Sequence, residues 1–219
     1  AETEAKAEES KEEAAASGDL ITVGYAQVGA ESDWRTANTE SFKSTFTEEN
    51  GYKLIFDDAQ QKQENQIKAI RSFIQQEVDY IVLAPVTETG WDTVLQEAKD
   101  AGIPVIIVDR MVDVSDDSLY TAWVGSNFKL EGQKAMAWLD AYLEAKGRGD
   151  EDINLVDIQG TIGASAQIGR TQGFDDAVEA HDNWTTLAQQ SGEFTQAKGQ
   201  EVMESILKQS GDDISRRPS

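Results

Sequence analysis

The sequence of 219 residues contains no cysteine and only one histidine, and it is poor in basic residues. The absence of cysteine excludes disulfides and thiol chemistry, and the single histidine, His181, excludes a metal site built from several histidines. Nineteen basic residues against forty-one acidic ones give a net charge of −22, which repels nucleic acid and anionic lipid surfaces. No apolar run approaches the roughly 20 residues of a membrane span, and the first residues lack the pattern of a signal peptide.

Residues 1–19 differ in composition from the rest of the chain. The stretch AETEAKAEESKEEAAASGD contains seven acidic and two basic residues and no large apolar side chain. Such a segment cannot bury enough apolar surface to offset the entropy that it would lose on ordering. We therefore predict a disordered acidic tether over residues 1–19.

From Leu20 onward, short apolar runs alternate with segments in which apolar residues recur at helical spacing. Almost continuous apolar strands that alternate with helices indicate an α/β fold with parallel strands covered on both faces. The predicted strands are residues 21–27, 52–58, 79–85, 104–109, 120–126, 153–159 and 184–190. The predicted helices are residues 34–49, 63–76, 91–101, 127–146, 165–180 and 195–210.

The strand rhythm loosens near residues 120–127, before the long helix, and indicates a crossover between two lobes. We expect a first lobe over residues 20–125 and a second lobe over residues 126–219. The last helix should lead into another strand, as every earlier helix does, but the chain reads ISRRPS instead. A parallel sheet that stops there leaves a strand edge uncovered, so we expect the second lobe to be incomplete.

Four loops follow the carboxyl ends of predicted strands, which is where open α/β sheets bind ligands. In these loops Trp34 offers a planar apolar face, the arginines offer rigid forks of donors, and the carboxylates accept hydrogen bonds. A sugar needs both kinds of contact, because its C–H faces stack on aromatic rings while its hydroxyls donate and accept. We therefore predict polyol recognition, without a metal or a cofactor. The candidate ligand-binding residues are Glu31, Trp34, Arg35, Asp109, Arg110 and Arg170.

Each of these features also has a simpler interpretation. Trp34 could be a packed anchor, and Asp109 with Arg110 could form a local ion pair. Arg170 could be a solvated side chain on a helix face, and His181 is interpreted as a surface histidine. The glycines of GTIGAS could cradle a phosphate, but the run matches neither GxGxxG nor the P-loop with its lysine. The binding interpretation is favoured because the polar residues converge on one side of one predicted sheet system.

With these residues in view, the chain resembles the periplasmic sugar-binding proteins of bacterial ABC importers, of the ribose-binding type. It is most similar to the galactofuranose-binding branch of these type I periplasmic binding proteins. The resemblance extends over nearly everything from Ile21 to Ile206. The stretches that carry it are VGAESDWR, DDAQQKQENQIKAIRSF, APVTETGWDTVLQEAKDAGIPVIIVDR, DIQGTIGASAQIGR and SGEFTQAKGQEVMES.

The resemblance implies two Rossmann-like lobes that close on one monosaccharide and deliver it to the permease of an ABC transporter, without enzymatic turnover. By this resemblance, Trp34 and Arg35 line the sugar from the first lobe, with Glu31 as a further contact in the same loop. Asp109 and Arg110 bind ring hydroxyls, and the remaining candidate arginine reaches the sugar from the second lobe.

Family members also continue well beyond the point where this chain ends, so the resemblance implies a C-terminal truncation or a reading-frame change after about Ile214. Related proteins of Gram-positive bacteria are lipid-anchored through an N-terminal cysteine and a polar spacer. Residues 1–19 resemble that spacer without its cysteine. The expected location is therefore extracytoplasmic, in the periplasm or at the cell surface, with a membrane link only through a lost lipid anchor.

Two other classes of function are alternatives, and the first of them shares this two-lobe architecture. A sugar-responsive transcription regulator needs a basic helix-turn-helix before the first strand, where this chain is acidic. A sugar-acting α/β enzyme needs catalytic groups, and the sequence has no GxSxG motif, no triad and no metal set. Asp57 and Asp58 are better explained as solvated acids at a strand end than as a catalytic pair. The residues alone do not choose among pentose, hexopyranose and hexofuranose.

Overall fold

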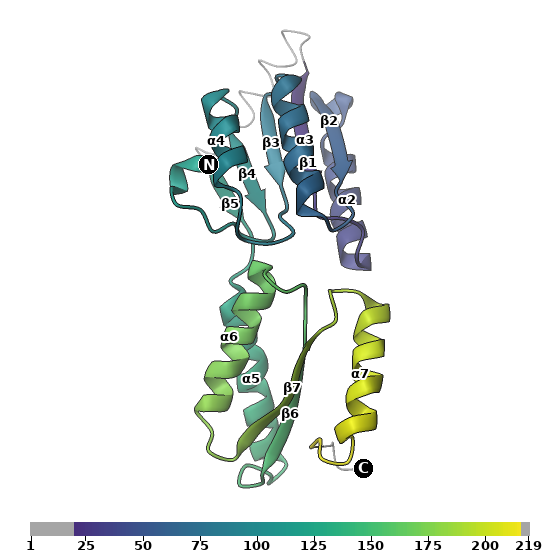
Figure 1. Cartoon of the computed structure of the whole chain (residues 1–219), viewed down its shortest axis with the longest axis vertical. Coiled ribbons are helices and arrows are strands. Elements are labelled where there is room, and N and C mark those ends of the chain that lie inside the picture. The colour runs from purple at the N-terminus through teal and green to yellow at the C-terminus, as the bar shows by residue number, and fades with distance from the viewer. Residues whose placement is uncertain (1–19, 216–219) are drawn as a thin grey trace. The chain divides into compact units, whose positions relative to one another are not determined.

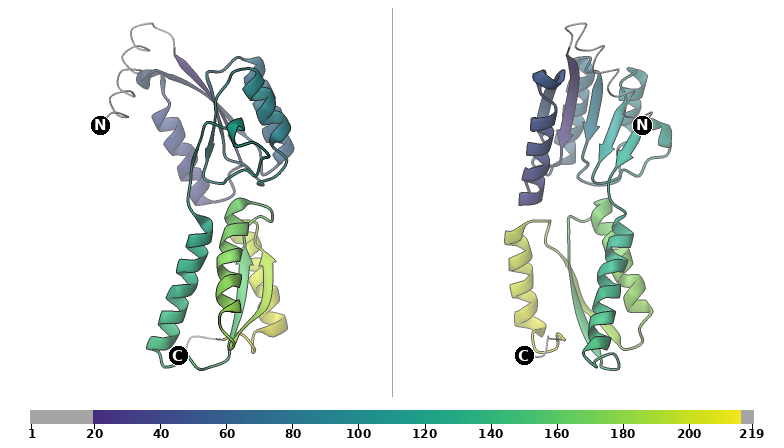
Figure 2. Two further views of the ribbon diagram at one scale, coloured as in Figure 1. Left: turned by 90° about the vertical axis from the view of Figure 1, so that its left-hand side faces the viewer. Right: turned by 180° about the vertical axis from the view of Figure 1, so that it is seen from behind.

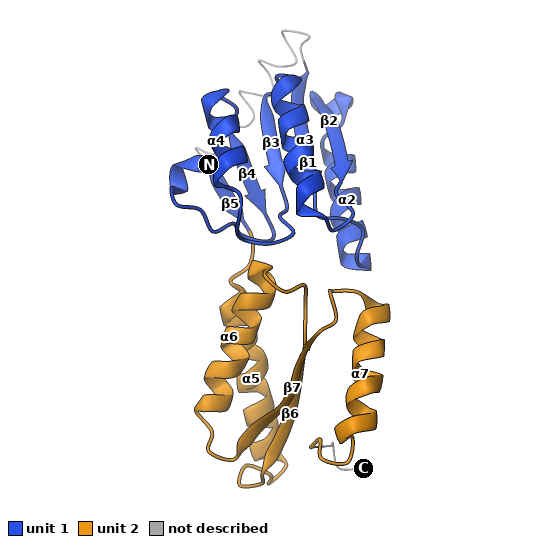
Figure 3. Cartoon of the chain, viewed as in Figure 1, with its two compact units in different colours: residues 1–124 blue, residues 125–219 orange. Residues whose placement is uncertain are grey.

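The computed structural model describes residues 20–215 of the chain. The expected tether, residues 1–19, and the last four residues, 216–219, lie outside this range. The chain divides into two compact units, residues 1–124 and residues 125–219, which Figure 3 shows in different colours. We refer to them as unit 1 and unit 2 and describe each by itself.

Unit 1 is built on a five-stranded parallel sheet with the order β2-β1-β3-β4-β5. Because β1 lies between β2 and β3, the sheet grows first to one side of β1 and then to the other. The carboxyl ends of β1 and β3 therefore form the switch point at which open α/β sheets bind ligands. The strands are β1 (Ile21–Gln27), β2 (Tyr52–Asp58), β3 (Tyr80–Leu83), β4 (Val105–Val108) and β5 (Ala122–Val124).

Three α-helices of unit 1 pack on the two faces of this sheet (Figures 1 and 2). Helices α3 and α4 pack on one face and α2 packs on the other. Strand β3 has an apolar sequence because both of its faces are covered. Ile81 and Leu83 pack toward α3 and α4, while Val82 faces the α2 side. The helices are α2 (Asp33–Thr45), α3 (Gln63–Gln75) and α4 (Asp92–Asp100).

The predicted helix over residues 34–49 is interrupted in the structure. Helix α2 ends at Thr45, and a separate 3-10 turn follows at Glu48–Asn50. The side chain of Thr47 caps this turn by accepting a hydrogen bond from the backbone N–H of Asn50, and Gly51 ends it with φ of 84°. Local hydrogen bonds of this kind compete with helix continuation, which explains the break.

The described part of unit 2, residues 125–215, contains a two-stranded parallel sheet and three helices. Helices α5 and α6 lie side by side, and Gly132 allows this because a Cβ there would collide with the backbone of Arg170. The core of this unit is formed by Met136, Leu143, Ile153 and Trp184. The elements are α5 (Phe128–Ala145), β6 (Ile153–Gln159), α6 (Ser165–Glu179), β7 (Trp184–Ser191) and α7 (Gln196–Ser210).

The predicted α/β class with parallel sheets is confirmed, and each predicted strand and helix has a counterpart in the structure. Shifts at the element ends are small. Strand β3, for example, ends at Leu83 rather than at Pro85. Among the helices within residues 20–215, none combines the length and the apolar character needed to cross a membrane.

We expect Gly24→Ala to lower the free energy of unfolding by about 1–3 kcal/mol, because overpacking a core forces strained side chains. A Cβ at Gly24, in β1, would lie 2.5 Å from Cγ of the buried Phe73. Chemical denaturation measures the effect. The same substitution should cost less in a Phe73→Leu background, and an equal cost in both backgrounds would contradict this close approach.

Candidate functional site

The loop after β1 leads directly into α2, and the start of this helix positions two predicted site residues. Ser32 is the N-cap, and its hydroxyl accepts a hydrogen bond from the backbone N–H of Arg35 at 3.2 Å. Asp33 in the first turn suits the positive end of the helix dipole. The sequence SDWR therefore places Trp34 and Arg35 in the first turn of α2.

Arg35 is buried, with 1% of its surface exposed. Its Nε donates to Glu31 Oε1 at 3.0 Å, and its Nη2 donates to Asp109 Oδ2 at 2.6 Å. Burial by itself would lower the pKa of Arg35, but the charges of Glu31 and Asp109 outweigh this effect and raise the pKa above its ordinary value. Arg35 is therefore protonated and joins the loop after β1 to the end of β4.

Arg110 is a second buried arginine, with 3% of its surface exposed. Its Nη1 donates to the carbonyl oxygen of Val86 at 3.1 Å, and its Nη2 donates to Glu31 Oε1 at 3.3 Å. Glu31 Oε1 thus accepts from both arginines, while Asp109 accepts from Arg35. Instead of an isolated local pair, Asp109 and Arg110 belong to a network that joins the loops after β1, β3 and β4.

Two atoms of this network, Glu31 Oε2 and Arg35 Nη1, are buried without a hydrogen-bond partner among the described residues. An unpaired buried polar atom costs about 1–3 kcal/mol, so such atoms are usually satisfied. One of the two atoms is an acceptor and the other is a donor. A hydroxyl group both donates and accepts, so it suits either kind of atom.

Asp109 has a left-handed backbone conformation, with φ of 62°. This region is uncommon for a residue other than glycine, although aspartate tolerates it better than most. The N–H of Asp109 donates to the carbonyl of Val124 at 2.9 Å, and its own carbonyl accepts from Trp123 Nε1 at 3.2 Å. Strand β5 therefore holds the turn that directs the Asp109 carboxylate toward Arg35.

Trp34 is 57% exposed and does not serve as a packed anchor of unit 1, which corrects the simpler interpretation of this residue. Its ring lies 4.8 Å from Cζ of Arg35, within the range of a cation–π contact. An exposed indole beside buried hydrogen-bonding groups offers an apolar face next to polar ones.

A second polar network, which the sequence reasoning missed, ties α2 to β1. The Tyr25 hydroxyl donates to Asn38 Oδ1 at 2.8 Å, and Gln27 Nε2 donates to the same oxygen at 3.1 Å. Gln27 Oε1 accepts from the hydroxyl of Thr39 at 2.8 Å. The signal in the sequence was the polar Gln27 at the end of an apolar strand. This network fixes the helix that carries Trp34.

Arg170, the sixth candidate, lies in unit 2 on α6 and is partly exposed. Its Nη2 and Nε lie 2.9 and 3.0 Å from Glu131 Oε2, and its guanidinium lies 4.9 Å from the ring centroid of Phe128. The side chain is thus held by α5 rather than freely solvated.

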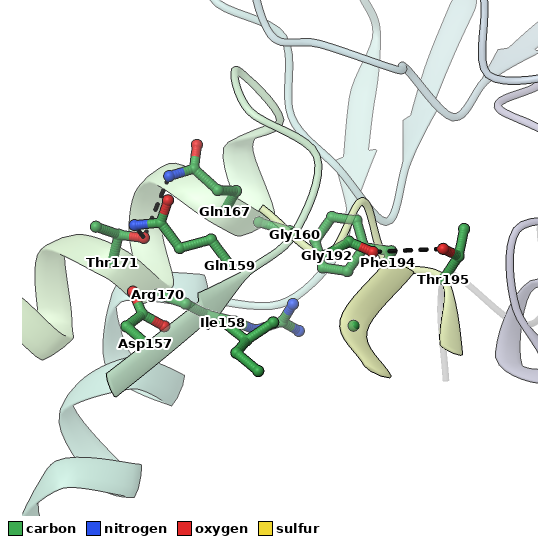
Figure 4. Close-up of a pocket in the computed structure, with 12 residues that line it drawn as sticks. Asp157, Ile158, Gln159, Gly160, Gln167, Arg170, Thr171, Gly192, Phe194 and Thr195 are labelled. Carbon is green, nitrogen blue, oxygen red and sulfur yellow. Dashed lines mark hydrogen bonds between the residues drawn. The ribbon is translucent and has the colours of Figure 1, made fainter. Parts of the chain in front are cut away.

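Arg170 also lines a cavity of about 270 Å³ at the carboxyl end of β6, shown in Figure 4. Gln159 and Gln167 both donate to the hydroxyl of Thr171 on its wall, at 3.0 and 3.2 Å. Asp157 Oδ2 is buried there without a hydrogen-bond partner in the described part of the chain, and burial raises the pKa of this carboxyl. The wall of the cavity therefore offers amide, hydroxyl and carboxyl groups.

Other candidates have structural explanations. Gly160, in GTIGAS, packs against the ring of Phe194, because a Cβ at this position would overlap that ring. His181 is half-buried rather than a free surface residue: it stacks on Trp184 with centroids 3.9 Å apart, and its Nδ1 lies 2.7 Å from the carbonyl of Ala177. Within residues 20–215, no group of three or more acidic, histidine or cysteine side chains could hold a metal ion.

Comparison with known families gives one match over most of the chain. Residues 23–215 match the model described as a periplasmic binding protein domain. Among curated proteins, the chain is 50% identical over 188 residues to the galactofuranose-binding protein YtfQ of Escherichia coli (strain K12). This alignment covers 86% of the chain but 57% of the relative. The ribose import binding protein RbsB of Bacillus subtilis (strain 168) is 30% identical over 72% of the chain and 48% of its own length.

Solved structures give similar matches. A galactofuranose binding protein has a TM-score of 0.82 and 48% identity, over 88% of this chain and 63% of that one. A Mycobacterium smegmatis protein in complex with β-D-fucofuranose has the same TM-score and identity, over 88% and 62%. The arabinose transporter component of Shewanella sp. ANA-3, bound to L-arabinofuranose, has a TM-score of 0.79 and 49% identity, over 87% and 61%. The chain thus spans about three fifths of the length of these relatives.

We expect Glu31→Gln to lower the free energy of unfolding by about 3–5 kcal/mol, because it leaves two buried guanidinium groups without their shared carboxylate. The matched control is Glu97→Gln, which removes a carboxylate from an exposed pair with Arg71 and should cost no more than about 1 kcal/mol. Urea denaturation compares the two. Equal costs would show that the Glu31 carboxylate does not compensate the buried arginines.

Burial raises the pKa of Tyr25 from 10.0 to about 12. The folded state favours the neutral phenol, so this contribution to stability is complete below about pH 10 and declines as the pH rises toward 12. An ultraviolet titration should show a tyrosine that ionises near pH 12, and Tyr25→Phe should remove this late step near pH 12 although Tyr120, whose pKa burial also raises, is still present. Tyr80→Phe, at an exposed position, should leave the late step in place. Persistence of the late step without Tyr25 would contradict the assignment.

Proposed function

We infer the function of this chain from its membership: the chain belongs to the periplasmic binding protein domain family, whose model matches residues 23–215. We propose that it binds a monosaccharide, without turnover, for delivery to the permease of an ABC transporter. The observation that carries this proposal is the network of Glu31, Arg35, Asp109 and Arg110 beside the exposed Trp34, at the carboxyl end of a parallel sheet.

A furanose sugar is the proposed ligand. The curated relative at 50% identity is named for galactofuranose, and the solved structures at 48 and 49% identity contain fucofuranose and arabinofuranose. The ribose import protein is more distant, at 30% identity. The names of these proteins describe binding and import, which supports capture rather than catalysis.

The electrostatics of the site favour an uncharged ligand. Two carboxylates and two guanidinium groups balance each other, so no net charge is left for the ligand to neutralise. Glu31 Oε2 and Arg35 Nη1 are an acceptor and a donor without partners among residues 20–215, which suits a hydroxyl group. The exposed face of Trp34 suits the C–H face of a sugar ring.

The proposed mechanism is closure of two lobes, residues 20–125 and 126–219, on one sugar. Binding energy drives such a closure because only the closed form lets both lobes contact the ligand. In this proposal Glu31, Trp34, Arg35, Asp109 and Arg110 contribute from the first lobe, and Arg170 contributes from the second. The proposed location is outside the cytoplasm, in the periplasm or at a lipid-anchored cell surface.

Calorimetric titration with methyl β-D-galactofuranoside and methyl β-D-galactopyranoside tests the proposal with two sugars that differ only in ring form. Ribose, arabinose and galactose complete the panel. Heat with the furanoside and none with the pyranoside is the expected result. Binding of the pyranoside with equal affinity overturns the furanose assignment, and no binding of any sugar overturns the proposed function for this chain.

We expect Trp34→Ala to weaken sugar binding by about tenfold, because the sugar ring loses the aromatic surface on which it stacks. The free energy of unfolding should change little, since Trp34 is 57% exposed. Trp138→Ala is the matched control, because Trp138 is 61% exposed on α5 of unit 2 and lies outside the candidate site. Calorimetry and denaturation of the same samples separate the two effects, and equal losses of affinity would remove Trp34 from the site.

A further inference from the structure

Gln66 is a fully buried amide that belongs to none of the predicted ligand contacts. It lies in the first half of α3, and 0% of its surface is exposed. Its Nε2 donates to the carbonyl oxygens of Ala26 and Ala84, at 3.1 and 2.6 Å. Its Oε1 accepts from the backbone N–H of Val86 at 2.9 Å. One side chain thus holds three backbone groups from two segments of the chain.

These backbone groups lie at the switch point of the unit 1 sheet. The register between β1 and β3 ends at Ala26 and Leu83, and the N–H of Ala84 still donates to the carbonyl of Ala26 at 3.1 Å. The next residue, Pro85, has no N–H, so it cannot extend the ladder. Beyond this point the side chain of Gln66 supplies hydrogen bonds that the strands no longer provide, and these hydrogen bonds fix the loop after β3.

Val86 connects Gln66 to the candidate site. Its N–H is held by Gln66, and its carbonyl oxygen accepts from Arg110 Nη1 at 3.1 Å. The other Nη of Arg110 donates to Glu31, which also accepts from Arg35. The Val86 carbonyl is therefore one of the groups that hold the Arg110 guanidinium in its direction within the network.

We propose that Gln66 is a positioning residue for sugar binding: through Val86 it orients Arg110 toward the ligand. This inference rests on the proposed function of the site. Gln66 itself contacts no sugar. Its amide meets the requirement for two donated hydrogen bonds and one accepted hydrogen bond, which neither a carboxylate nor an apolar side chain of similar length can satisfy.

Gln66→Met is the first test, because methionine has a similar length and removes all three hydrogen bonds. The matched control is Gln63→Met, one turn earlier in α3. Gln63 bonds the carbonyl of Thr89 and the hydroxyl of Thr87, in the same loop, and within residues 20–215 it has no hydrogen bond to Val86. Both variants lose a glutamine that ties α3 to this loop, so a difference between them reports on Val86 and Arg110.

The first measurement needs no sugar. Hydrogen bonds to Val86 and Glu31 restrict rotation of the Arg110 guanidinium, which NMR detects as resolved Nη–H signals. In Gln66→Met we expect this rotation to be about tenfold faster, as the loss of one well-placed hydrogen bond allows. In Gln63→Met the Arg110 signals should be those of the wild type. A purely structural role of Gln66 would lower stability without changing these signals.

The second measurement is calorimetric titration with methyl β-D-galactofuranoside. We expect Gln66→Met to weaken binding by about tenfold and Gln63→Met to leave it near the wild-type value. Unchanged Arg110 signals together with unchanged affinity in Gln66→Met overturn the inference. If the wild type binds no sugar, the proposed function fails, and the Arg110 signals alone decide whether Gln66 positions this side chain.

Gln66→Glu keeps the inference falsifiable if Gln66→Met does not fold. An ionised carboxylate can accept from Val86 but faces the carbonyl oxygens of Ala26 and Ala84, whereas the protonated acid donates to one of them. Because burial raises the pKa of a carboxyl, ordering of Arg110 in this variant should improve as the pH falls from about 8 to about 5. The pH dependence of Arg110 ordering in the wild type, which also contains Glu31 and Asp109, is the reference. Identical profiles overturn the inference.

Discussion

The candidate site depends on the hydrogen bonds that the carboxylate of Glu31 makes with two buried guanidinium groups. Two guanidinium groups are nearly inaccessible in unit 1, and an unpaired charge at such a position would cost several kcal/mol. Glu31 Oε1 lies between them and accepts from both, and Asp109 supplies the second negative charge. The other local features follow from this constraint. Ser32 starts α2 where Arg35 can reach inward, and the left-handed backbone of Asp109 directs its carboxylate to the same place.

Buried amide side chains form hydrogen bonds with backbone groups where the sheet ends. The carboxyl ends of parallel strands leave backbone groups without ladder partners, and these groups must be bonded if they are buried. Gln66 bonds three backbone groups between β1 and β3, one of which, the carbonyl of Ala26, also accepts from the N–H of Ala84. Gln27 joins the end of β1 to α2. The same edge therefore needs polar side chains for folding and holds the polar side chains proposed to bind a ligand. Stability and the proposed binding would therefore depend on adjacent groups.

The sequence was sufficient to predict the elements, because apolar runs and helical spacing report burial directly. It also identified Arg35 and Arg110 as forks of donors, but not their distant partners, since Arg35 meets Asp109 and Arg110 meets Glu31 only through the folded loops. Gln66 was missed although it had a local signal: it precedes the buried Ile70 and Phe73 by four and seven residues, so it lies on the buried face of α3. The contact between Gly160 and Phe194 joins segments 34 positions apart and has no local signal.

The charge of the chain and the charge of the site act in the same direction on ligand choice. A net charge of −22 repels anions such as sugar phosphates at a distance, with a range set by the ionic strength. A site with an unbalanced pair of arginines would attract those anions at short range, but here two carboxylates cancel the two guanidinium charges. An uncharged polyol experiences neither effect and gains only directional hydrogen bonds and ring contact. The compensation that allows both arginines to be buried is therefore also what would direct the site toward a neutral sugar.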